Sequence, residues 1–315
     1  VQNALIMTWN ISRRKFLISS TGIATLATIA PSELLAIKKR KSVRFGVLTD
    51  SHYADREPSG TRYYRQSLEK MEEAINVLNQ EKVDFAIHLG DFKDEHPTRV
   101  ESDTIKFLQD IESEYSQFNG PRYHCIGNHD LDSISKEQFQ TNVTNTGIDS
   151  SETYFSFDHN GFHFIVLDPN FHPDGRPHHK GDYEWFEANL PESQWEWFED
   201  DLAKTKLPTI VFSHFTLYHF VKGDAVFHMN EYVRAQKIME DSGKVIATFH
   251  GHVHEENYTA INGIHYCTHL GMVDYDGLEN NSFAIVEVNE REINITGYKR
   301  TSNKTLKKGH LKSNY

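Results

Sequence analysis

The sequence predicts a protein of the α/β class, in which helices connect parallel strands. Two observations lead to this prediction. Short apolar runs rich in β-branched and aromatic residues alternate with amphipathic helical stretches along the first half of the chain. Several of these runs end in a cluster of Asp, Asn, His or Gly residues, which is typical of ligand sites at the carboxyl ends of parallel strands.

The first half of the chain reads strand, helix, strand, helix, strand. Strands are expected at 43–49, 84–89 and 122–126 because each run is short, apolar and bounded by polar or glycine residues. Helices are expected at 62–81 and 104–115, where apolar residues recur every three or four positions. Helical crossovers between consecutive strands imply that the strands are parallel.

The second half is expected to add a hairpin, a long loop and further strands and helices. Asn160-Gly161 separates two apolar runs, a strong signal for a two-residue hairpin turn. The remaining expected elements are a polar loop at 168–183, helices at 191–203 and 231–241, and strands at 208–213, 244–249, 256–261, 264–269, 281–288 and 292–299. The basic run Lys304–Lys312 is expected to be a frayed tail. We predict a single domain over 37–315.

Composition excludes some partners and leaves others open. The 315 residues carry a formal net charge of −12, which argues against binding to duplex nucleic acid because that affinity depends on Lys and Arg neutralising phosphates. Nineteen histidines are compatible with a metal site. Cys125 and Cys267 lie in apolar runs and are expected to be buried free thiols, with a disulfide as the alternative.

Residues 1–36 have the layout of an export signal. The run Ser12-Arg13-Arg14-Lys15-Phe16-Leu17 precedes a moderately apolar stretch and then Leu34-Leu35-Ala36, a possible cleavage point. The paired arginines resemble a bacterial twin-arginine signal, which implies contact with that export machinery and a periplasmic or secreted protein. After removal of this segment, no integral membrane span is expected. A basic surface helix and an uncleaved anchor are the alternatives.

Five polar clusters follow apolar runs and supply the candidate functional residues. They are Asp50-Ser51-His52, Gly90-Asp91, Gly127-Asn128-His129-Asp130, Ser213-His214 and Gly251-His252-Val253-His254. Carboxylate, amide and imidazole donors without thiolates suit divalent Mn, Fe or Zn, and they do not fit a structural zinc finger. Asp91 is the natural bridge between two ions, because a carboxylate has two oxygens and Gly90 permits a tight turn before it.

The ordered set D-x-H, GD, GNHD, H and GHxH resembles the motifs of the calcineurin-like metallophosphoesterases. The resemblance runs from Val43 to about His254. It implies a four-layer α/β/β/α sandwich, with two mixed β-sheets flanked by helices. It also implies a metal-dependent hydrolase of phosphoric esters that acts on a small phosphoester.

The resemblance also implies roles for individual residues. One divalent ion would be held by Asp50, His52, Asp91 and His254, and the second by Asp91, Asn128, His214 and His252. A water or hydroxide between the ions would be the nucleophile. His129 would be the general acid, and Asp130 is expected to hydrogen-bond His129 and raise its pKa.

The substrate is less well defined by the sequence. Residues 53–55 and 61–68 resemble the manganese-dependent ADP-ribose/CDP-alcohol diphosphatase branch, in which Arg62 and Arg65 could bind a substrate phosphate. That branch has Gln in the first motif where this chain has His52, so a general phosphomonoesterase or phosphodiesterase ranks ahead of a nucleotide diphosphatase. His178 is a further candidate substrate contact, or else part of a solvated loop. Two non-enzymatic alternatives are a metal-retaining binding module without turnover and a structural protein with a decayed site.

Overall fold

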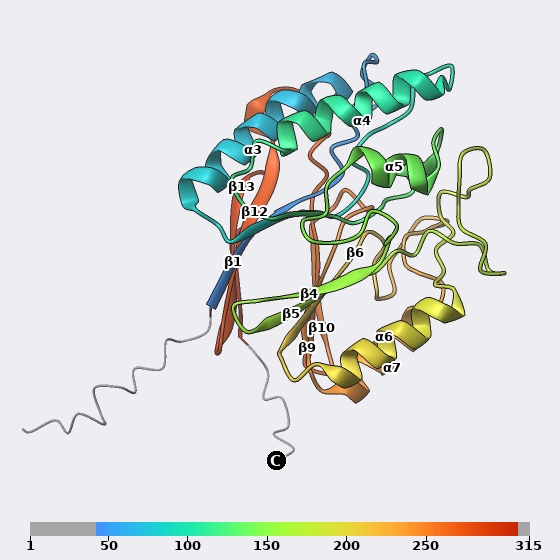
Figure 1. Ribbon diagram of the computed structural model, residues 1–315. Coiled ribbons are helices and arrows are strands. Elements are labelled where there is room, and N and C mark those ends of the chain that lie inside the picture. The colour runs from blue at the N-terminus through green and yellow to red at the C-terminus, as the bar shows by residue number, and fades with distance from the viewer. Residues whose placement is uncertain (1–41, 308–315) are drawn as a thin grey trace, which may run out of the picture. The chain divides into compact units, whose positions relative to one another are not determined.

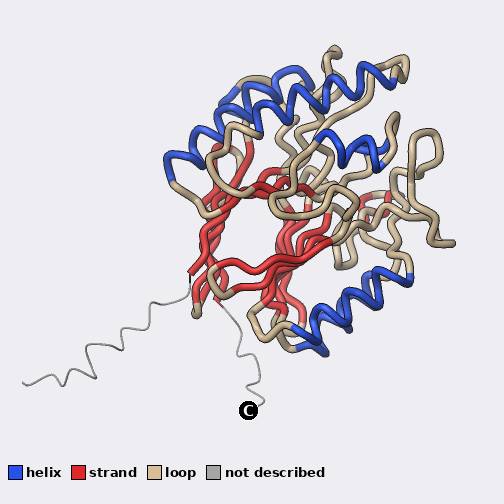
Figure 2. The backbone as a smooth tube through the Cα atoms, viewed as in Figure 1, coloured by secondary structure: helices blue, strands red, loops and turns tan. Residues whose placement is uncertain are grey.

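The computed structural model describes residues 42–307, so the expected export segment 1–36 lies outside the described residues. Within the described part, two six-stranded sheets face each other and helices cover their outer faces (Figures 1 and 2). Both sheets contain parallel and antiparallel pairs. This arrangement confirms the four-layer sandwich with two mixed sheets flanked by helices.

The first sheet has the strand order β14-β13-β12-β1-β2-β3. The strands are β1 (Ser42–Leu48), β2 (Phe85–His88), β3 (Arg122–His124), β12 (Ser282–Asn289), β13 (Glu292–Lys299) and β14 (Lys304–Lys307). As expected from their helical crossovers, β1, β2 and β3 are parallel. The carboxyl ends of these three strands therefore lie at one edge of the sheet.

The second sheet has the order β10-β11-β9-β6-β5-β4. The strands are β4 (Phe155–His159), β5 (Phe162–Val166), β6 (Thr209–Ser213), β9 (Val245–His250), β10 (Asn257–Ile261) and β11 (Ile264–Thr268). The predicted hairpin joins β4 to β5, with Asn160 at φ 47° and Gly161 at φ 81°, values that suit a turn of this kind. Parallel pairing of β5, β6 and β9 places the ends of β6 and β9 together.

Two helical layers enclose the sheets. The helices α3 (Ser67–Glu81), α4 (Glu101–Tyr115) and α5 (Lys136–Asn142) pack on the outer face of the first sheet. The helices α6 (Glu192–Lys204) and α7 (Tyr232–Ser242) pack on the second sheet. None of the helices in residues 42–307 is long and apolar enough to cross a membrane.

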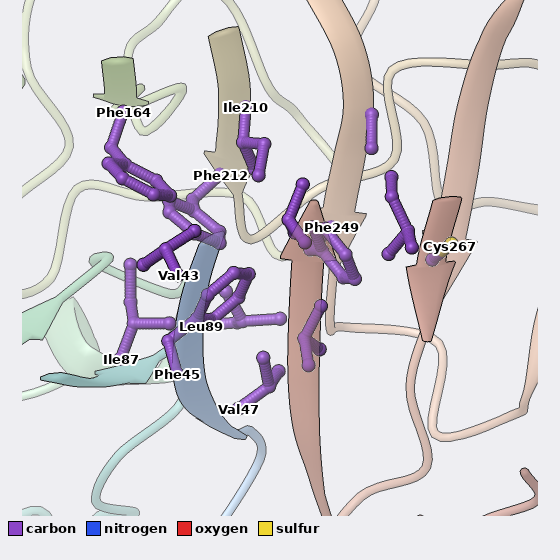
Figure 3. Packing of buried hydrophobic residues seen from close by; sticks show 14 of the residues in the cluster. Val43, Phe45, Val47, Ile87, Leu89, Phe164, Ile210, Phe212, Phe249 and Cys267 are labelled. Atoms are coloured by element: carbon purple, nitrogen blue, oxygen red, sulfur yellow. The ribbon is translucent and has the colours of Figure 1, made fainter. Parts of the chain in front are cut away.

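The core between the sheets is aromatic. The ring of Phe45 on β1 lies 5.8 Å from Phe164, 5.7 Å from Phe212 and 5.8 Å from Phe249, in edge-to-face contacts across the sandwich (Figure 3). Edge-to-face pairs are favourable because the positive ring edge meets the negative ring face. This packing fixes the spacing of the two sheets, and with it the separation of the strand ends that carry the polar clusters.

The structure corrects several predicted elements. The helix expected from residue 62 begins at Ser67, after a 3-10 turn at Tyr64–Gln66, and the helix expected from residue 104 begins at Glu101. The predictions missed α5, although Ser135 and Gln138 form a capping box that the sequence contains as S-x-x-Q. They also missed the short hairpin of β7 (Val221–Lys222) and β8 (Ala225–Val226) and the 3-10 turns His129–Leu131 and Leu278–Asn280.

The expected frayed tail is wrong for Lys304–Lys307. These residues form the edge strand β14, and Leu306 is buried against the core between the sheets. Leu306 is buried while Thr305 and Lys307 on either side of it are exposed, which is the two-residue period of a strand with one buried face. Cys125 and Cys267 are both buried and free, as expected.

Candidate metal centre

The polar clusters converge where strands from both sheets end. Asp50 and His52 follow β1, Asp91 follows β2, and the backbone N–H groups of Asp50 and His52 donate to the carbonyls of Gly90 (3.0 Å) and Asp91 (2.9 Å). The clusters after β3, β6 and β9 add the remaining residues, Asn128, His129, His214, His252 and His254. The structure therefore brings together all seven expected metal ligands and His129.

The backbone at these residues is unusual. Asp50, His52, Asp91, His252 and His254 have φ angles of 51°, 43°, 53°, 68° and 57°, in the left-handed region. Asp and His are among the residues that tolerate this region best, but it still carries a cost outside glycine. Such conformations persist where the surrounding structure enforces them, and they gather at functional sites.

Two glycines allow the clusters to approach one another. A Cβ on Gly127 would lie 2.2 Å from both the backbone nitrogen and Oδ1 of Asp91. A Cβ on Gly251 would lie 2.0 Å from Oγ1 of Thr49 and 2.6 Å from Oδ2 of Asp50. These contacts are far shorter than any side chain permits, so glycine is required at both positions for the loops to meet.

The first group of donors consists of Asp50, His52 and His254. Nε2 of His254 lies 3.3 Å from Oδ1 of Asp50 and 3.0 Å from Nε2 of His52. Two neutral imidazoles that turn their lone pairs toward each other at this distance would repel, so the pair calls for a proton or a cation between them. These three donors lie within 4.8 Å of one another, as a metal site requires.

The second group consists of Asp91, His214 and His252, with Asn128 beside them. Nε2 of His214 lies 3.2 Å from Oδ2 of Asp91 and 3.1 Å from Oδ1 of Asn128. Nε2 of His252 is buried and makes no hydrogen bond within the described residues, so its lone pair is free for a metal. Buried polar atoms rarely stay unsatisfied, and a buried imidazole nitrogen without a protein partner is suited to bind a metal.

Asp91 lies between the two groups. Its Oδ2 is 3.3 Å from Nε2 of His52 in the first group and 3.2 Å from Nε2 of His214 in the second. Its Oδ1 accepts a hydrogen bond of 2.8 Å from the backbone N–H of His129. A carboxylate in this position can serve both groups, which fits the bridging role expected from the sequence.

The electrostatics of the metal-free centre reflect the close packing of opposite charges. Burial opposes ionisation of Asp91, but His214, His52 and His129 outweigh it and hold the pKa of Asp91 well below its usual range. Burial lowers the pKa of His214, but the charge of Asp91 outweighs it and raises this pKa to about 9. Burial likewise lowers the pKa of His254, but Asp50 and Asp274 raise it to about 9. The raised pKa values show that the carboxylates favour positive charge at these two donors.

Two carboxylates that the sequence analysis missed support the histidines from outside. Oδ2 of Asp274 lies 2.8 Å from Nδ1 of His254, and Oδ2 of Asp94 lies 3.3 Å from Nδ1 of His52. A carboxylate on the far nitrogen fixes the tautomer and orientation of a metal-binding histidine. Neither carboxylate belongs to a motif: Asp94 comes three residues after Asp91, and Asp274 lies in a loop far along the chain.

His129 faces the cavity beside the two donor groups. Its Nδ1 lies 3.9 Å from Oδ2 of Asp94 and 3.8 Å from Oδ2 of Asp132, and its ring stacks on Trp185 at 5.1 Å. Burial lowers the pKa of His129, but Asp91, Asp132 and Asp94 together raise it above its ordinary value. A protonated imidazole at this place can deliver a proton to a leaving oxygen.

The prediction that Asp130 hydrogen-bonds His129 is wrong. Oδ1 of Asp130 accepts the backbone N–H of Phe92 at 2.9 Å, and Oδ2 accepts that of Gly127 at 2.8 Å. Burial, then the nearby charge of Asp91, raises the pKa of Asp130 to about 7. Asp130 therefore ties the loop after β3 to the loop after β2, and Asp132 and Asp94 take the place beside His129.

A cavity of about 490 Å³ opens next to the donors. Its lining includes Arg62, as expected for a substrate contact, together with Arg56, Trp185, Phe186 and Phe227, which the sequence analysis missed. The last three are aromatic side chains in loops, where no periodicity marks them.

The other two expected substrate contacts lie outside this cavity lining. Arg65 is half exposed and pairs with Asp55 and Glu57. The side chain of His178 is buried beside His172 and Glu187, neither of which lines the cavity. His178 is therefore neither a cavity residue nor part of a solvated loop.

Comparison with known proteins agrees with this geometry. The family model of the calcineurin-like phosphoesterases matches residues 43–256. A manganese-dependent ADP-ribose/CDP-alcohol diphosphatase of Oryza sativa subsp. japonica is 26% identical over 268 residues, covering 71% of this chain and 81% of that protein. One of Arabidopsis thaliana, with the same description, is 31% identical over 130 residues, or 39% of this chain and 41% of that protein.

Solved structures share the fold. A dimetal phosphatase from Danio rerio superposes with a TM-score of 0.70 at 19% identity, over 85% of this chain and 99% of that one. A purple acid phosphatase from yellow lupin (Lupinus luteus) gives 0.59 at 16% identity, over 85% of this chain and 53% of that one. The matched motifs and the converging donors lead to one conclusion: the chain belongs to the calcineurin-like phosphoesterase family and is a metal-dependent phosphoester hydrolase with two divalent ions as cofactors.

Proposed function

We propose that this enzyme hydrolyses the diphosphate bond of nucleoside-diphosphate-linked substrates, the class that includes ADP-ribose and CDP-alcohols. The observation that carries the proposal is the pair of arginines and the aromatic side chains that line the cavity beside the metal donors. The similarity to diphosphatases of that description supports it. The proposal reverses the order in which the sequence ranked general phosphoesterase activity and nucleotide diphosphatase activity.

The two donor groups divide the ligands between the ions. We propose that Asp50, His52, Asp91 and His254 hold one ion, and that Asp91, Asn128, His214 and His252 hold the other. When bound, two such ions activate a water molecule as the nucleophile and stabilise the charge on the phosphoryl oxygens. His129 then protonates the leaving phosphate oxygen, since its raised pKa keeps it in the acid form near neutral pH.

The arginines account for a second phosphate. Nη1 of Arg56 lies 3.3 Å from Oδ1 of Asp94, and Nη1 of Arg62 lies 3.6 Å from Oδ2 of the same residue. Both guanidinium groups are partly exposed in the cavity, so each can still contact a phosphate through its remaining N–H donors. The single phosphate of a monoester would bind at the metal centre. A diphosphate has a second phosphate, and these arginines are placed to bind it.

The aromatic side chains provide a place for a base. Trp185 stacks on His129 with one face, and Trp185 and Phe186 are 41% and 48% exposed at the cavity, so the exposed part of each ring can still accept a stacked partner. Stacking of a base on an aromatic ring contributes about 1–3 kcal/mol by alanine substitution and tolerates different bases. Tolerance of this kind suits substrates that carry either adenine or cytosine.

The test compares Arg62→Ala with Arg65→Ala. These arginines are three positions apart, but only Arg62 lines the cavity, so Arg65→Ala is a matched control. With manganese, we expect wild-type kcat/KM to be higher for ADP-ribose and CDP-choline than for p-nitrophenyl phosphate. Arg62→Ala should lower kcat/KM for the diphosphates about 10-fold or more, the loss of one charged hydrogen bond, and leave p-nitrophenyl phosphate nearly unchanged.

Other outcomes would contradict this proposal. Equal loss on diphosphates and monoesters in Arg62→Ala would mean that the arginine supports the metal centre rather than a second phosphate. A wild-type preference for monoesters would favour the general phosphomonoesterase. Two bound ions without turnover on any of these compounds would favour a binding module.

We also propose that the chain is exported through a twin-arginine pathway to the periplasm or beyond. The sequence Arg13-Arg14 followed by Phe16-Leu17 and an apolar stretch supports this proposal. Lysine keeps the charge but not the arginine pair, so Arg13→Lys/Arg14→Lys should leave the protein in the cytoplasm on cell fractionation. Lys38→Arg, outside the motif, is the control. Export of the double variant at the wild-type level would refute this pathway.

A further inference from the structure

A second cluster of metal-ligating side chains lies in the segment between β5 and α6, outside the dimetal centre. It consists of His172, His178 and Glu187, whose donor atoms all lie within 4.8 Å of one another. Oε2 of Glu187 lies 2.9 Å from Nδ1 of His172 and 3.5 Å from Nε2 of His178. The two imidazole rings are 4.5 Å apart.

The imidazole of His178 is buried without a hydrogen-bond partner in the described part of the chain. The side chain of His178 is 1% exposed, and neither of its ring nitrogens makes a hydrogen bond within residues 42–307. A buried, unpaired imidazole is costly, because its polar atoms have lost water without gaining a partner.

The spacing of the donors fits a small cation. Tetrahedral zinc with Zn–N distances of about 2.0–2.1 Å places neighbouring donor atoms about 3.3 Å apart. The two distances from Glu187 to the histidines, 2.9 Å and 3.5 Å, lie on either side of that value. Glu187 is one carboxylate shared by two histidines, and it is 24% exposed, which leaves water a route to a fourth position.

The cluster also has the outer support that metal-binding histidines need. Nε2 of His172, the nitrogen that faces away from Glu187, lies 3.2 Å from Oδ1 of Asp182. The two groups are within ion-pair distance without forming a hydrogen bond, so Asp182 favours the proton on Nε2 by its charge and leaves the lone pair of Nδ1 for the ion. The backbone is fixed as well, because the N–H of His178 donates to the carbonyl of Asn170, whose side chain donates to the carbonyl of Ile126.

We propose that His172, His178 and Glu187 bind a third divalent ion of the zinc type, separate from the catalytic pair. Two imidazoles and one carboxylate without a thiolate are the donor set that zinc shares with neighbouring transition metals. The ion cross-links residues 172, 178 and 187, and it neutralises the charge of Glu187 next to two buried rings. We assign it a structural role, because none of these three residues lines the cavity beside the dimetal centre.

The position of the site explains what the ion does. Trp185 and Phe186 directly precede Glu187, and they reach over the dimetal centre, where Trp185 stacks on His129 and the Phe186 ring lies 6.2 Å from that of His252. An ion that holds Glu187 therefore fixes the stretch of chain that carries both aromatic side chains. Preorganised contacts of this kind reduce the ordering cost of substrate binding.

The experiment counts metal ions and does not depend on turnover. Full-length wild type, Glu187→Gln, His178→Gln and His179→Gln are saturated with zinc, freed of excess metal by gel filtration and analysed by mass spectrometry for zinc per chain. His179 is exposed and next to His178, so His179→Gln is the matched control. We expect three ions in wild type and His179→Gln, and two in Glu187→Gln and His178→Gln. Circular dichroism establishes that each variant is folded.

A further variant separates this site from the catalytic pair. Asp91→Asn weakens both catalytic ions but leaves the third, so one ion should remain in this variant and be lost when Glu187→Gln is added. That result supports the site even if the enzyme proves inactive on diphosphates. Two ions in wild type and in every variant of the cluster, or three ions in all of them, would overturn the proposal.

Discussion

Replacement of Asp274 tests whether the carboxylate behind His254 is needed to hold a metal. Oδ2 of Asp274 accepts from Nδ1 of His254 at 2.8 Å, and Oδ1 accepts the hydroxyl of Thr61 at 2.7 Å. In Asp274→Asn, the amide oxygen can still accept from His254, so the variant removes the charge and keeps the shape. Asp274→Ala removes both. The two variants therefore separate the charge from the hydrogen bond.

The magnitude follows from the role of such partners in metal sites. Loss of a carboxylate behind a metal-binding histidine costs about 10–100-fold in metal affinity, or about 1.4–2.8 kcal/mol. Because Asp274→Asn keeps an acceptor, we expect its loss at the low end, about 10-fold. Asp274→Ala should lie near 100-fold, since Nδ1 of the partly buried His254 is then left without this acceptor.

The pH dependence gives the prediction a second check. Asp274 also raises the pKa of His254, which reaches about 9, so at pH 7 a proton competes with the metal for Nε2. Removing the carboxylate lowers this pKa and weakens the competing proton. The two effects oppose each other below pH 9. The decrease in affinity should therefore be small near pH 7 and should reach its full size, about 10-fold or 100-fold for the two variants, near pH 9.

The assay is manganese binding by calorimetry from pH 7 to pH 9 under anaerobic conditions. The control is Asp276→Asn, because Asp276 is two residues away, exposed, and pairs with Gln66 rather than with a histidine. One of the two manganese ions should weaken in the Asp274 variants and neither in the control. An affinity unchanged at pH 9, or a loss that grows toward pH 7, would refute the reasoning.

Three other predictions concern the acid, the protons and the thiols. His129→Asn should lower kcat about 100-fold or more without changing the metal content. It should also abolish the fall in activity at alkaline pH, because that fall reports loss of the acid form of His129. A variant with wild-type kcat would exclude His129 as the acid. The pKa values of His214 and His254 are about 9, so both are expected to be protonated at pH 7.5, and binding of both metals should release about two protons from them. Calorimetry in buffers of different ionisation enthalpy measures this release. A release near zero would contradict the assigned charges. Cys125 and Cys267 are buried and free, so a thiol reagent should find no reactive thiol in the native protein and both in denaturant, and a reductant should leave the melting temperature unchanged.

The fold and the convergence of the donors could be predicted because both follow from local patterns. Alternating strands and helices require parallel strands, and parallel strands bring their carboxyl ends to one edge. Asp50, Asp91 and His214 each come directly after an apolar run, so their neighbourhood follows from strand order alone. The sequence lacked a comparable pattern for Trp185 or Asp274, whose positions depend on loop conformation.

The errors at Asp130 and His178 share a physical cause. Both predictions took adjacency in sequence or polarity of a segment as a guide to where a side chain points. Asp130 follows His129 directly, but the 3-10 turn at His129–Leu131 directs its carboxylate to backbone N–H groups and places Asp132 beside His129 instead. His178 lies in a polar, proline-containing loop, yet the loop folds back on itself and buries the ring against His172.

The left-handed backbone of the metal donors connects these observations to function. Each of these strained residues lies two to four positions after the end of a strand, so the donors face one another rather than continuing along the sheet. Such conformations are unfavourable for Asp and His in isolation, so they depend on the contacts between loops that Gly127 and Gly251 permit. A chain that holds five of its seven donors in place at this cost has a preformed site. Without metal, the carboxylates of Asp50 and Asp91 attract the protonated His214 and His254. Bound metal ions would attract all of these donors and hold them together more strongly.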